Sequence, residues 1–169
     1  MKRTKPRSAE SQVQRMAHRW PSLKMRVYRP MIIDATPSIQ WIGPIRGFQR
    51  EYRILAQWSW LEATAVPYVF LLESALKPRD GEDYIDIPHL ILDGKTPENS
   101  ALCLFDPDEG QWDNTMWISD TIIPWASEWL HHYEFWHVDG LWRGPNAPGP
   151  INIREMRCLA EGDQDGQRS

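Results

Sequence analysis

Cysteine is scarce in this chain, which holds only Cys103 and Cys158 among its 169 residues. Two cysteines cannot form the disulfide framework of a small secreted domain. No apolar run follows the basic residues at the start of the chain, so no secretory signal is expected. No run approaches the roughly 18 apolar residues that a transmembrane helix needs. We therefore expect a cytoplasmic protein with reduced thiols and no membrane partner.

The chain also lacks the common motifs for binding nucleotides and metals. Neither GxxxxGK[ST] nor GxGxxG is present, and no CxxC pair occurs. His132 and His137 are not spaced to share one helical face as in HExxH, and the adjacent His131 and His132 point in different directions. We expect no metal and no cofactor. The net charge of −4 argues against a general affinity for nucleic acid.

Tryptophan, in contrast, is abundant. Ten tryptophans are present, and such wide rings either fill a core with few residues or form adhesive surfaces. The length fits one domain, which we expect to span residues 8–159 and to end in a short helix at 151–159. A flexible basic tail at 1–7 and a disordered tail at 160–169 are expected on either side.

Helical periodicity occurs near both ends of this domain. Apolar residues at three- and four-residue steps predict a first helix over 8–20 that ends at Pro21. A second helix is predicted from about Asp113 to Gly140. Pro124 is tolerated if Asp120 caps this helix, because the first helical N–H groups have no partner anyway; otherwise Pro124 marks a kink.

Between the helices the period is that of strands. Short links between successive strands favour an antiparallel, four-stranded meander, so the predicted class is α+β with helices flanking the sheet. A long irregular stretch follows the last strand and carries Cys103, and loops of such length are often functional. The predicted strands cover residues 39–48 (with a bend at Gly43-Pro44), 52–60, 67–72 and 84–92.

Cys103 is the candidate reactive residue. Its apolar neighbours Leu102, Leu104 and Phe105 are typical of a small thiol buried in a core. The same residues can instead anchor a loop from which Cys103 turns outward, with Pro107 stiffening the far side. We predict the second arrangement.

Titratable neighbours limit what this thiol can do. Asp106, Asp108 and Asp113 raise its pKa if they lie close, and a raised pKa suits acyl exchange better than attack by a free thiolate. A cysteine hydrolase needs a histidine beside the thiol, and His89 is the nearest one in sequence. Orienting the loop, or capping a strand end, is the alternative role for His89.

Several of these segments resemble the prokaryotic E2-like proteins of CBASS antiphage operons, and most of all the stand-alone E2 of short type II systems. The similarity covers about Gln49 to Trp142. It implies the ubiquitin-conjugating (UBC-like) fold, with Cys103 on an extended stretch beside a four-stranded meander. The residues that carry it are Pro88-His89, Leu102-Cys103-Leu104-Phe105, Pro107, Trp112, Trp117, Ile122-Ile123-Pro124-Trp125, Glu128-Trp129-Leu130, Tyr133-Glu134 and Trp136.

The resemblance implies a conjugating transferase that acts in antiviral defence. Cys103 would carry an acyl group as a thioester. The implied acyl donor is the C-terminus of a cGAS-like nucleotidyltransferase. Cys103 would transfer this acyl group to an amine or another acceptor, and the transfer would prime cyclic-nucleotide signalling. Whether a separate activating enzyme takes part stays open, and so does the identity of the acceptor protein.

The chain departs from its eukaryotic relatives at one point. They carry His-Pro-Asn shortly before the cysteine, where the Asn amide stabilises the oxyanion, whereas here Pro88-His89 is not directly followed by Asn. Asn99 and Asn114 are possible substitutes, and backbone N–H groups of the loop are another. The predicted catalytic set is therefore Cys103 with His89 and Asn99.

A non-catalytic function is the alternative. Exposed tryptophans, with the apolar residues around Cys103, would make the chain a binding module that holds and regulates the nucleotidyltransferase. Cys158 lies among charged residues near the C-terminus, and we predict that Cys158→Ser leaves activity intact.

Overall fold

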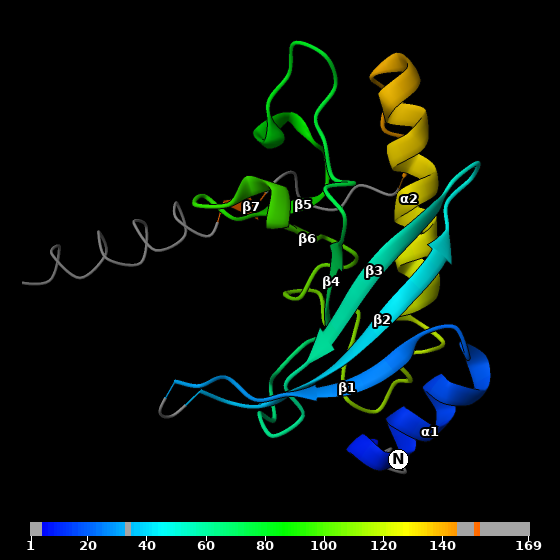
Figure 1. Ribbon diagram of the computed structural model, residues 1–169, viewed down its shortest axis with the longest axis vertical. Coiled ribbons are helices and arrows are strands. Elements are labelled where there is room, and N and C mark those ends of the chain that lie inside the picture. Colours follow the sequence, from blue (N-terminus) through cyan, green and yellow to red (C-terminus); the bar gives the residue numbers. More distant parts are fainter. Residues whose placement is uncertain (1–4, 33–34, 145–150, 153–169) are drawn as a thin grey trace, which may run out of the picture.

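The computed structural model describes residues 5–32, 35–144 and 151–152. Within them lie two α-helices and one sheet with the strand order β1-β2-β3-β4-β6-β5-β7, in which all pairings are antiparallel except the parallel pair β5–β7 (Figure 1). The predicted α+β class is confirmed. The elements are α1 Ala9–Arg19, β1 Lys24–Tyr28, β2 Ser38–Arg46, β3 Glu51–Trp58, β4 Tyr68–Leu71, the 3-10 turn η1 Tyr84–Asp86, β5 Leu90–Leu92, the 3-10 turn η2 Pro97–Asn99, β6 Ala101–Leu102, α2 Ile122–Asp139 and β7 Ile151–Asn152.

The first helix forms where its sequence predicts. Ser8 is the N-cap, and its hydroxyl accepts a hydrogen bond from the Ser11 N–H at 3.2 Å. Pro21 follows the last helical turn, because proline cannot continue the hydrogen-bond ladder. Gln12 and Met16 lie on the buried stripe, so α1 is fixed both by its cap and by its packing.

The hairpin β2–β3 forms the centre of the sheet. Buried and exposed residues alternate along β3, as the sequence predicts for a half-buried strand. The predicted bend at Gly43-Pro44 is wrong, because β2 runs on to Arg46 in register with β3. Only Ser38–Ile42 pair with β1, so Pro44 lies where β2 has a single neighbouring strand, a position that tolerates proline.

Two other predictions for the strands are wrong. Asp83 caps the 3-10 turn η1, so only the end of the predicted strand at 84–92 is extended, as β5. This short strand pairs with β6 rather than β4, so the four predicted segments do not form one meander. A four-stranded antiparallel meander is formed instead by β1, β2, β3 and β4, which pair in succession. The sequence did not predict β1, although its polar and apolar residues alternate, nor the two-residue β6.

The second helix starts nine residues later than predicted, at Ile122. Pro124 does sit in the first turn, as expected. Asp120 does not cap it, since its carboxylate binds Arg15 of α1 at 2.5 Å, and Thr121 is the N-cap residue. The helix ends at Gly140 as predicted, where a φ of +78° favours glycine.

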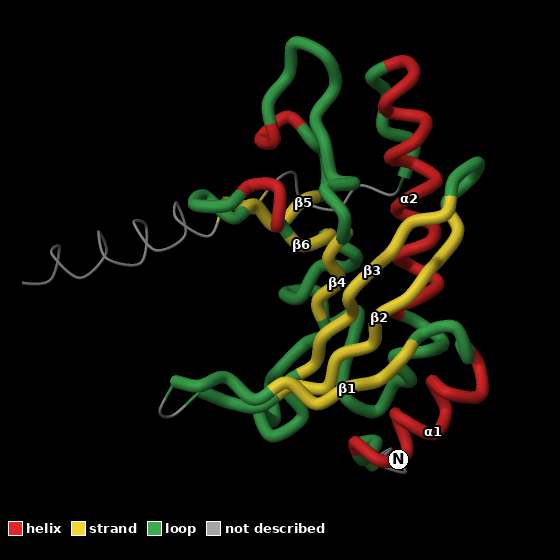
Figure 2. The backbone as a smooth tube through the Cα atoms, in the orientation of Figure 1, coloured by secondary structure: helices red, strands yellow, loops and turns green. Residues whose placement is uncertain are grey.

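Both helices pack against the same face of the sheet. Tyr52 of β3 contacts Tyr133 of α2, with ring centroids 6.5 Å apart. Val13 of α1 and Trp41 of β2 line a common groove. Helix α2 lies behind β2 and β3, whereas the chain between β4 and α2 consists mostly of loops and turns (Figure 2). These loops, together with α2, provide the residues of the site.

The predicted tails lie largely outside the described residues. Of the basic segment 1–7, residues 5–7 are described, and Arg7 contacts the rest of the domain. Its backbone N–H donates to the Asn114 carbonyl at 2.7 Å, and its guanidinium lies 4.4 Å from the Trp117 ring. Ile151–Asn152 form β7 rather than the start of the predicted last helix; the rest of that helix and the tail at 160–169 are not described. Within the described ranges, no helix has the length and apolar character needed to cross a membrane.

Candidate functional site

Cys103 directly follows β6, and a single backbone hydrogen bond fixes its position. Its N–H donates to the His89 carbonyl at 2.9 Å. Leu102 and Phe105 are buried in the core, as the sequence predicts for residues that anchor this stretch. The predicted outward thiol is wrong: Cys103 is only 4% exposed, and its Sγ lies 3.8 Å from the Phe105 carbonyl oxygen.

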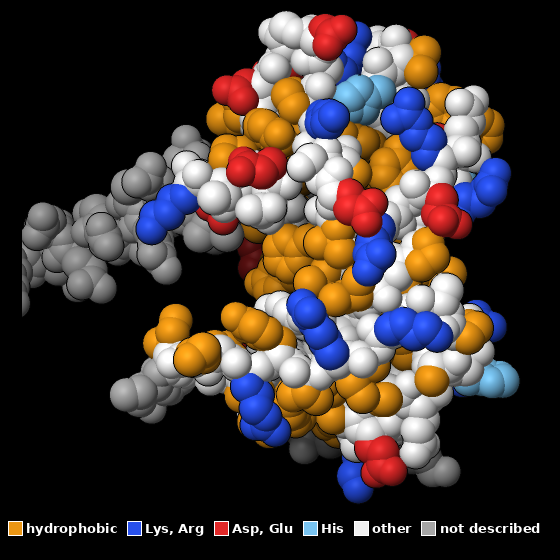
Figure 3. Space-filling view, in the orientation of Figure 1, with side chains coloured by type: hydrophobic (Ala, Val, Ile, Leu, Met, Phe, Trp, Pro, Cys, Tyr) orange, Lys and Arg blue, Asp and Glu red, His pale blue; other side chains and the backbone are white. Residues whose placement is uncertain are grey.

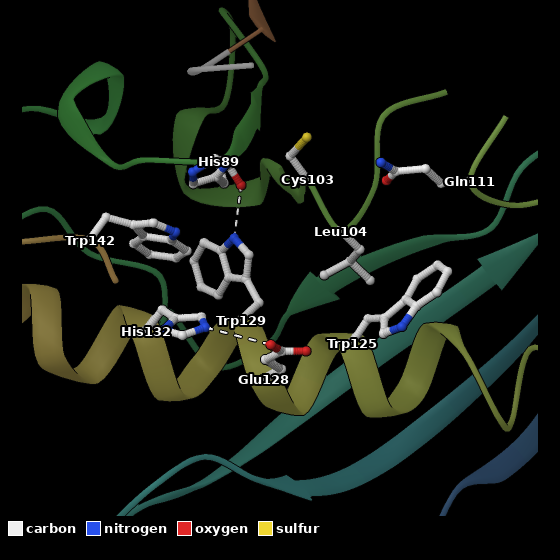
Figure 4. A pocket seen from close by; sticks show the side chains of 9 residues that line it. All are labelled: His89, Cys103, Leu104, Gln111, Trp125, Glu128, Trp129, His132 and Trp142. Atoms are coloured by element: carbon white, nitrogen blue, oxygen red, sulfur yellow. Dashed lines mark hydrogen bonds and ion pairs between the residues drawn. The ribbon is translucent and has the colours of Figure 1, made fainter. Parts of the chain in front are cut away.

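Despite this burial, Cys103 borders a cavity of about 200 Å³ between the β5–β6 region and α2. Side chains of α2 form the opposite wall, and Trp142 closes one end just beyond the helix (Figure 4). The walls are mainly aromatic, with few polar groups, which is the usual composition of a binding pocket. The lining residues are His89, Cys103, Leu104, Gln111, Trp125, Glu128, Trp129, His132 and Trp142.

The backbone of His89 organises this region. Its carbonyl accepts hydrogen bonds from the Cys103 N–H and from Trp129 Nε1 at 2.8 Å, so it joins the cysteine segment to α2. The φ of His89 is +54°, an uncommon value for a non-glycine residue. Such backbone strain persists where surrounding contacts hold it, and it concentrates at functional sites.

The ring of His89 is a separate feature of the site. It packs on Trp142 with a centroid distance of 5.0 Å, and its buried Nδ1 has no hydrogen-bond partner in the part of the chain that the structure describes. Burial lowers the pKa of His89, and the neighbouring His132 lowers it further. A neutral imidazole therefore faces the aromatic wall, while the backbone of the same residue positions Cys103.

The thiol is electrostatically disfavoured as an anion. Burial raises the pKa of Cys103, and the Asp106 carboxylate raises it further. Of the three carboxylates considered from sequence, Asp106 is the one with this effect. The environment matches the prediction of a thiol that is not tuned to exist as a free thiolate.

The sequence did not single out a second polar pair on α2 as part of a site. His132 Nε2 lies 3.8 Å from Glu128 Oε1, and this buried nitrogen has no hydrogen-bond partner within residues 5–32, 35–144 and 151–152. The two residues are four positions apart and therefore share one helical face. That spacing was the available signal, but only the cavity shows that the pair faces the same space as Cys103.

The predicted amide donors do not reach the cavity. Asn99 ends η2 and is exposed, and Asn114 lies beside Arg7 near α1. Gln111 lines the cavity instead, with its Oε1 accepting from the Asp106 N–H at 3.0 Å and its Nε2 donating to Glu109 at 2.7 Å. Cys158 is not among the described residues.

Nothing in the described part of the chain suggests a metal centre, since no group of three or more His, Cys, Asp or Glu is placed to hold an ion there. The side chains that line the cavity are one thiol, two imidazoles, one carboxylate, one amide, one leucine and three indoles.

An α+β fold with a thiol in a cavity between the sheet and a long helix fits a protein of the E2-like class. Residues 12–150 match the family model of the Type II CBASS E2 protein, and the chain belongs to this family. The resemblance predicted from sequence is thereby confirmed, and the family indicates an E2-like conjugating function associated with CBASS components. A comparison with curated proteins gave no match.

Proposed function

We propose that the protein is a stand-alone E2-like acyl carrier of CBASS antiphage defence. In this proposal Cys103 forms a thioester with the C-terminal carboxyl of a cGAS-like nucleotidyltransferase. The acyl group is then transferred from Cys103 to an acceptor amine, and this transfer primes cyclic-nucleotide signalling. The observation that carries the proposal is the position of Cys103: the family match includes it, and it is the one cysteine of the described residues that borders a cavity. We also propose that the sheet is a variant of the ubiquitin-conjugating fold.

The loading step is an acyl exchange. Cys103 Sγ bonds to the carbonyl carbon of an activated acyl donor, the bond from that carbon to the donor's leaving group breaks, and the thiol proton passes to solvent. Because the thiol is only 4% exposed, the donor must present a slim, extended C-terminal segment to the cavity. Since a leaving group of higher pKa departs more slowly, the raised pKa of Cys103 favours retention of the acyl group until an acceptor arrives.

The oxyanion formed during exchange needs hydrogen-bond donors. Asn99 is not placed to supply one, because it is exposed on η2 and does not line the cavity. The backbone N–H groups of Leu104 and Phe105 take this role in the proposal, because the Cys103 N–H already donates to the His89 carbonyl. The two hydrogen bonds to the His89 carbonyl hold the stretch from Cys103 to Phe105 against α2 and so contribute the required rigidity.

The test is an intact-mass measurement of the protein co-expressed with the nucleotidyltransferase encoded beside it. We expect an adduct on Cys103 that hydroxylamine releases, a more stable ester with Cys103→Ser, and no adduct with Cys103→Ala. Cys158→Ser is the matched control and should load like the wild type. An adduct that persists in Cys103→Ala would overturn the proposal.

The alternative is a non-catalytic module that binds the nucleotidyltransferase. The edge of the sheet formed by β1 favours this alternative. Strand β1 is exposed along its whole length, and the hairpin that follows β1 presents apolar side chains (Figure 3). If this alternative holds, Cys103→Ala retains both partner binding and phage protection. The exposed apolar residues are Met25, Val27, Tyr28, Met31 and Ile32.

A further inference from the structure

We infer that His132 accepts the proton of the incoming amine when the Cys103 thioester is discharged, and that Glu128 positions it. The inference rests on the proposed function, because it assigns a second residue to the same site. It starts from atoms that the loading step does not use.

Two buried imidazole nitrogens of the cavity, Nδ1 of His89 and Nε2 of His132, have no hydrogen-bond partner among the described residues. Buried polar atoms in folded proteins are nearly always hydrogen-bonded, so an unpartnered pair in one cavity indicates a polar occupant. Both rings pack on Trp142, with centroid distances of 5.0 Å for His89 and 5.6 Å for His132. The cavity therefore offers two nitrogens to a polar group, and Cys103 lines the same cavity.

The surroundings of the two imidazoles differ in a way that selects His132. His89 is 8% exposed and is packed against an indole, and among the described residues no carboxylate forms an ion pair with it. A proton on that ring would leave a buried, unpaired charge, which is costly. His132 Nε2 is 3.8 Å from Glu128 Oε1, so an imidazolium there has a counter-ion on the same helical face.

The walls of the cavity suit an aliphatic amine. Trp125, Trp129 and Trp142 offer apolar surface for the carbon stem, and indole faces attract an ammonium group. The Glu128 carboxylate attracts the same charge. An ammonium cannot attack a thioester, so the amine reacts in its neutral form, after its extra proton has passed to solvent. As the neutral amine attacks, its nitrogen gains positive charge and must lose a second proton, which we assign to His132.

The proposed step balances in atoms and charge. The amine nitrogen bonds to the thioester carbonyl carbon as its proton moves to His132 Nε2, directly or through one water. The bond between that carbon and Cys103 Sγ then breaks, and the thiolate receives the proton from His132. The products are an amide and the free thiol of Cys103.

The experiment separates loading from discharge. A peptide with the C-terminal sequence of the neighbouring nucleotidyltransferase, supplied as a mercaptoethanesulfonate thioester, is exchanged onto Cys103 and the loaded protein is isolated. Butylamine or hydroxylamine is then added, and loss of the adduct is followed by intact mass. Hydroxylamine is uncharged at neutral pH and cleaves thioesters rapidly without a catalyst, so its attack depends far less than that of butylamine on a proton acceptor in the protein.

We expect His132→Gln and His132→Ala to load like the wild type, to discharge to butylamine about 100-fold more slowly, and to discharge to hydroxylamine at the wild-type rate. Added imidazole should restore butylamine discharge in His132→Ala. Glu128→Gln should give a smaller loss. The control is His131→Gln, because His131 Nδ1 contacts the Ser127 carbonyl and its ring does not line the cavity.

The outcomes distinguish the two proposals. Wild-type discharge to butylamine in His132→Gln overturns the role of His132 while loading on Cys103 stands. An equal loss with both nucleophiles, not relieved by imidazole, shows that His132 is structural and also overturns the inference. Failure of the wild type to load overturns the proposed function, and the inference with it.

Discussion

At the scale of single residues, burial raises the pKa of the Cys103 thiol more than the neighbouring carboxylate does. Burial raises its pKa, and the Asp106 carboxylate adds to the effect. Asp106 also accepts a hydrogen bond from the Asp108 N–H at 2.9 Å through Oδ1, which an amide oxygen can replace. The charge of Asp106 can therefore be removed with little change to the loop.

Asp106→Asn should increase the reactivity of Cys103. Removing a neighbouring negative charge lowers the thiol pKa, so a larger fraction is thiolate at neutral pH. We expect alkylation by iodoacetamide to become a few-fold faster, located on Cys103 by peptide mass spectrometry. Asp108→Asn is the control, since Asp108 is exposed in the same loop and should leave the rate unchanged. A slower reaction in Asp106→Asn would contradict the assigned effect of Asp106.

Cys103→Ala should lower the free energy of unfolding by about 1 kcal/mol, because the residue is buried. That loss corresponds to a fall in Tm of roughly 2–4 °C. The measurement is thermal unfolding followed by circular dichroism, with Cys158→Ser as a comparison variant. A small drop in stability is thus expected for a reactive Cys103 as well, so melting cannot separate a structural from a catalytic cysteine.

Alkaline pH should weaken the contact between α2 and the loop after β4. The Tyr133 hydroxyl donates to the Lys77 carbonyl at 2.9 Å and accepts from the Lys77 N–H at 2.8 Å. Burial raises the pKa of Tyr133 to about 12, above its usual value. A raised folded-state pKa stabilises the protein below the unfolded-state pKa, and this stabilisation is lost as pH rises toward 12.

We therefore expect the free energy of unfolding to fall by on the order of 2 kcal/mol between about pH 10 and pH 12 through this residue. Urea denaturation at a series of pH values measures the fall. Tyr133→Phe should be less stable at pH 8 but should lose less between pH 10 and 12. An identical pH dependence in the variant would show that Tyr133 is not responsible.

At the scale of elements, α1 is fixed to the segment before α2 by a buried amide. Gln12 is 1% exposed; its Nε2 donates to the Met116 carbonyl at 2.8 Å and its Oε1 accepts from the Ile118 N–H at 3.0 Å. This arrangement also explains why residues 113–121 form turns instead of the predicted helix. Gln12 of α1 binds the Met116 carbonyl and the Ile118 N–H, two backbone groups that a helix would use for its own hydrogen bonds.

Gln12→Ala should lower the free energy of unfolding by about 3 kcal/mol, because two buried backbone groups lose their partners. Gln14→Ala on the same helix is the control, since Gln14 is exposed and should change stability by about 0.5 kcal/mol at most. Urea denaturation measures both. Equal effects of the two substitutions would show that the amide contributes little to the joint between α1 and this segment.

How well the sequence predicts an element depends on where its stabilising contacts come from. Helix α1 and the hairpin β2–β3 were predictable, because caps, breakers and alternation are local signals. Strand β6 was not, since two residues carry no period and the strand exists only through pairing with β4 and β5. Within the site, Cys103 was found from its motif, whereas His132 and Glu128 needed the packing of α2 against β5 and β6 to reveal their role.

At the scale of the whole molecule, rigidity is distributed unevenly around the cavity. Strand β3 has paired neighbours on both sides, whereas the loop from Pro107 to Gln111 is exposed. Hydrogen exchange followed by mass spectrometry should show the amides of β3 exchanging at least about 100-fold more slowly than those of this loop. Similar rates in both would mean that the sheet opens as readily as the rim of the cavity.

The contacts of α1 also have a consequence during synthesis. Gln12 and Met116 are 104 positions apart, and at translation rates of about 5–20 residues per second the ribosome needs roughly 5–20 s to make that length. A helix of 11 residues is marginal on its own. Its apolar side can meet Trp41 of β2 early, but Gln12 must wait for its partners, so the speed of elongation sets how long the joint between α1 and the segment before α2 stays open.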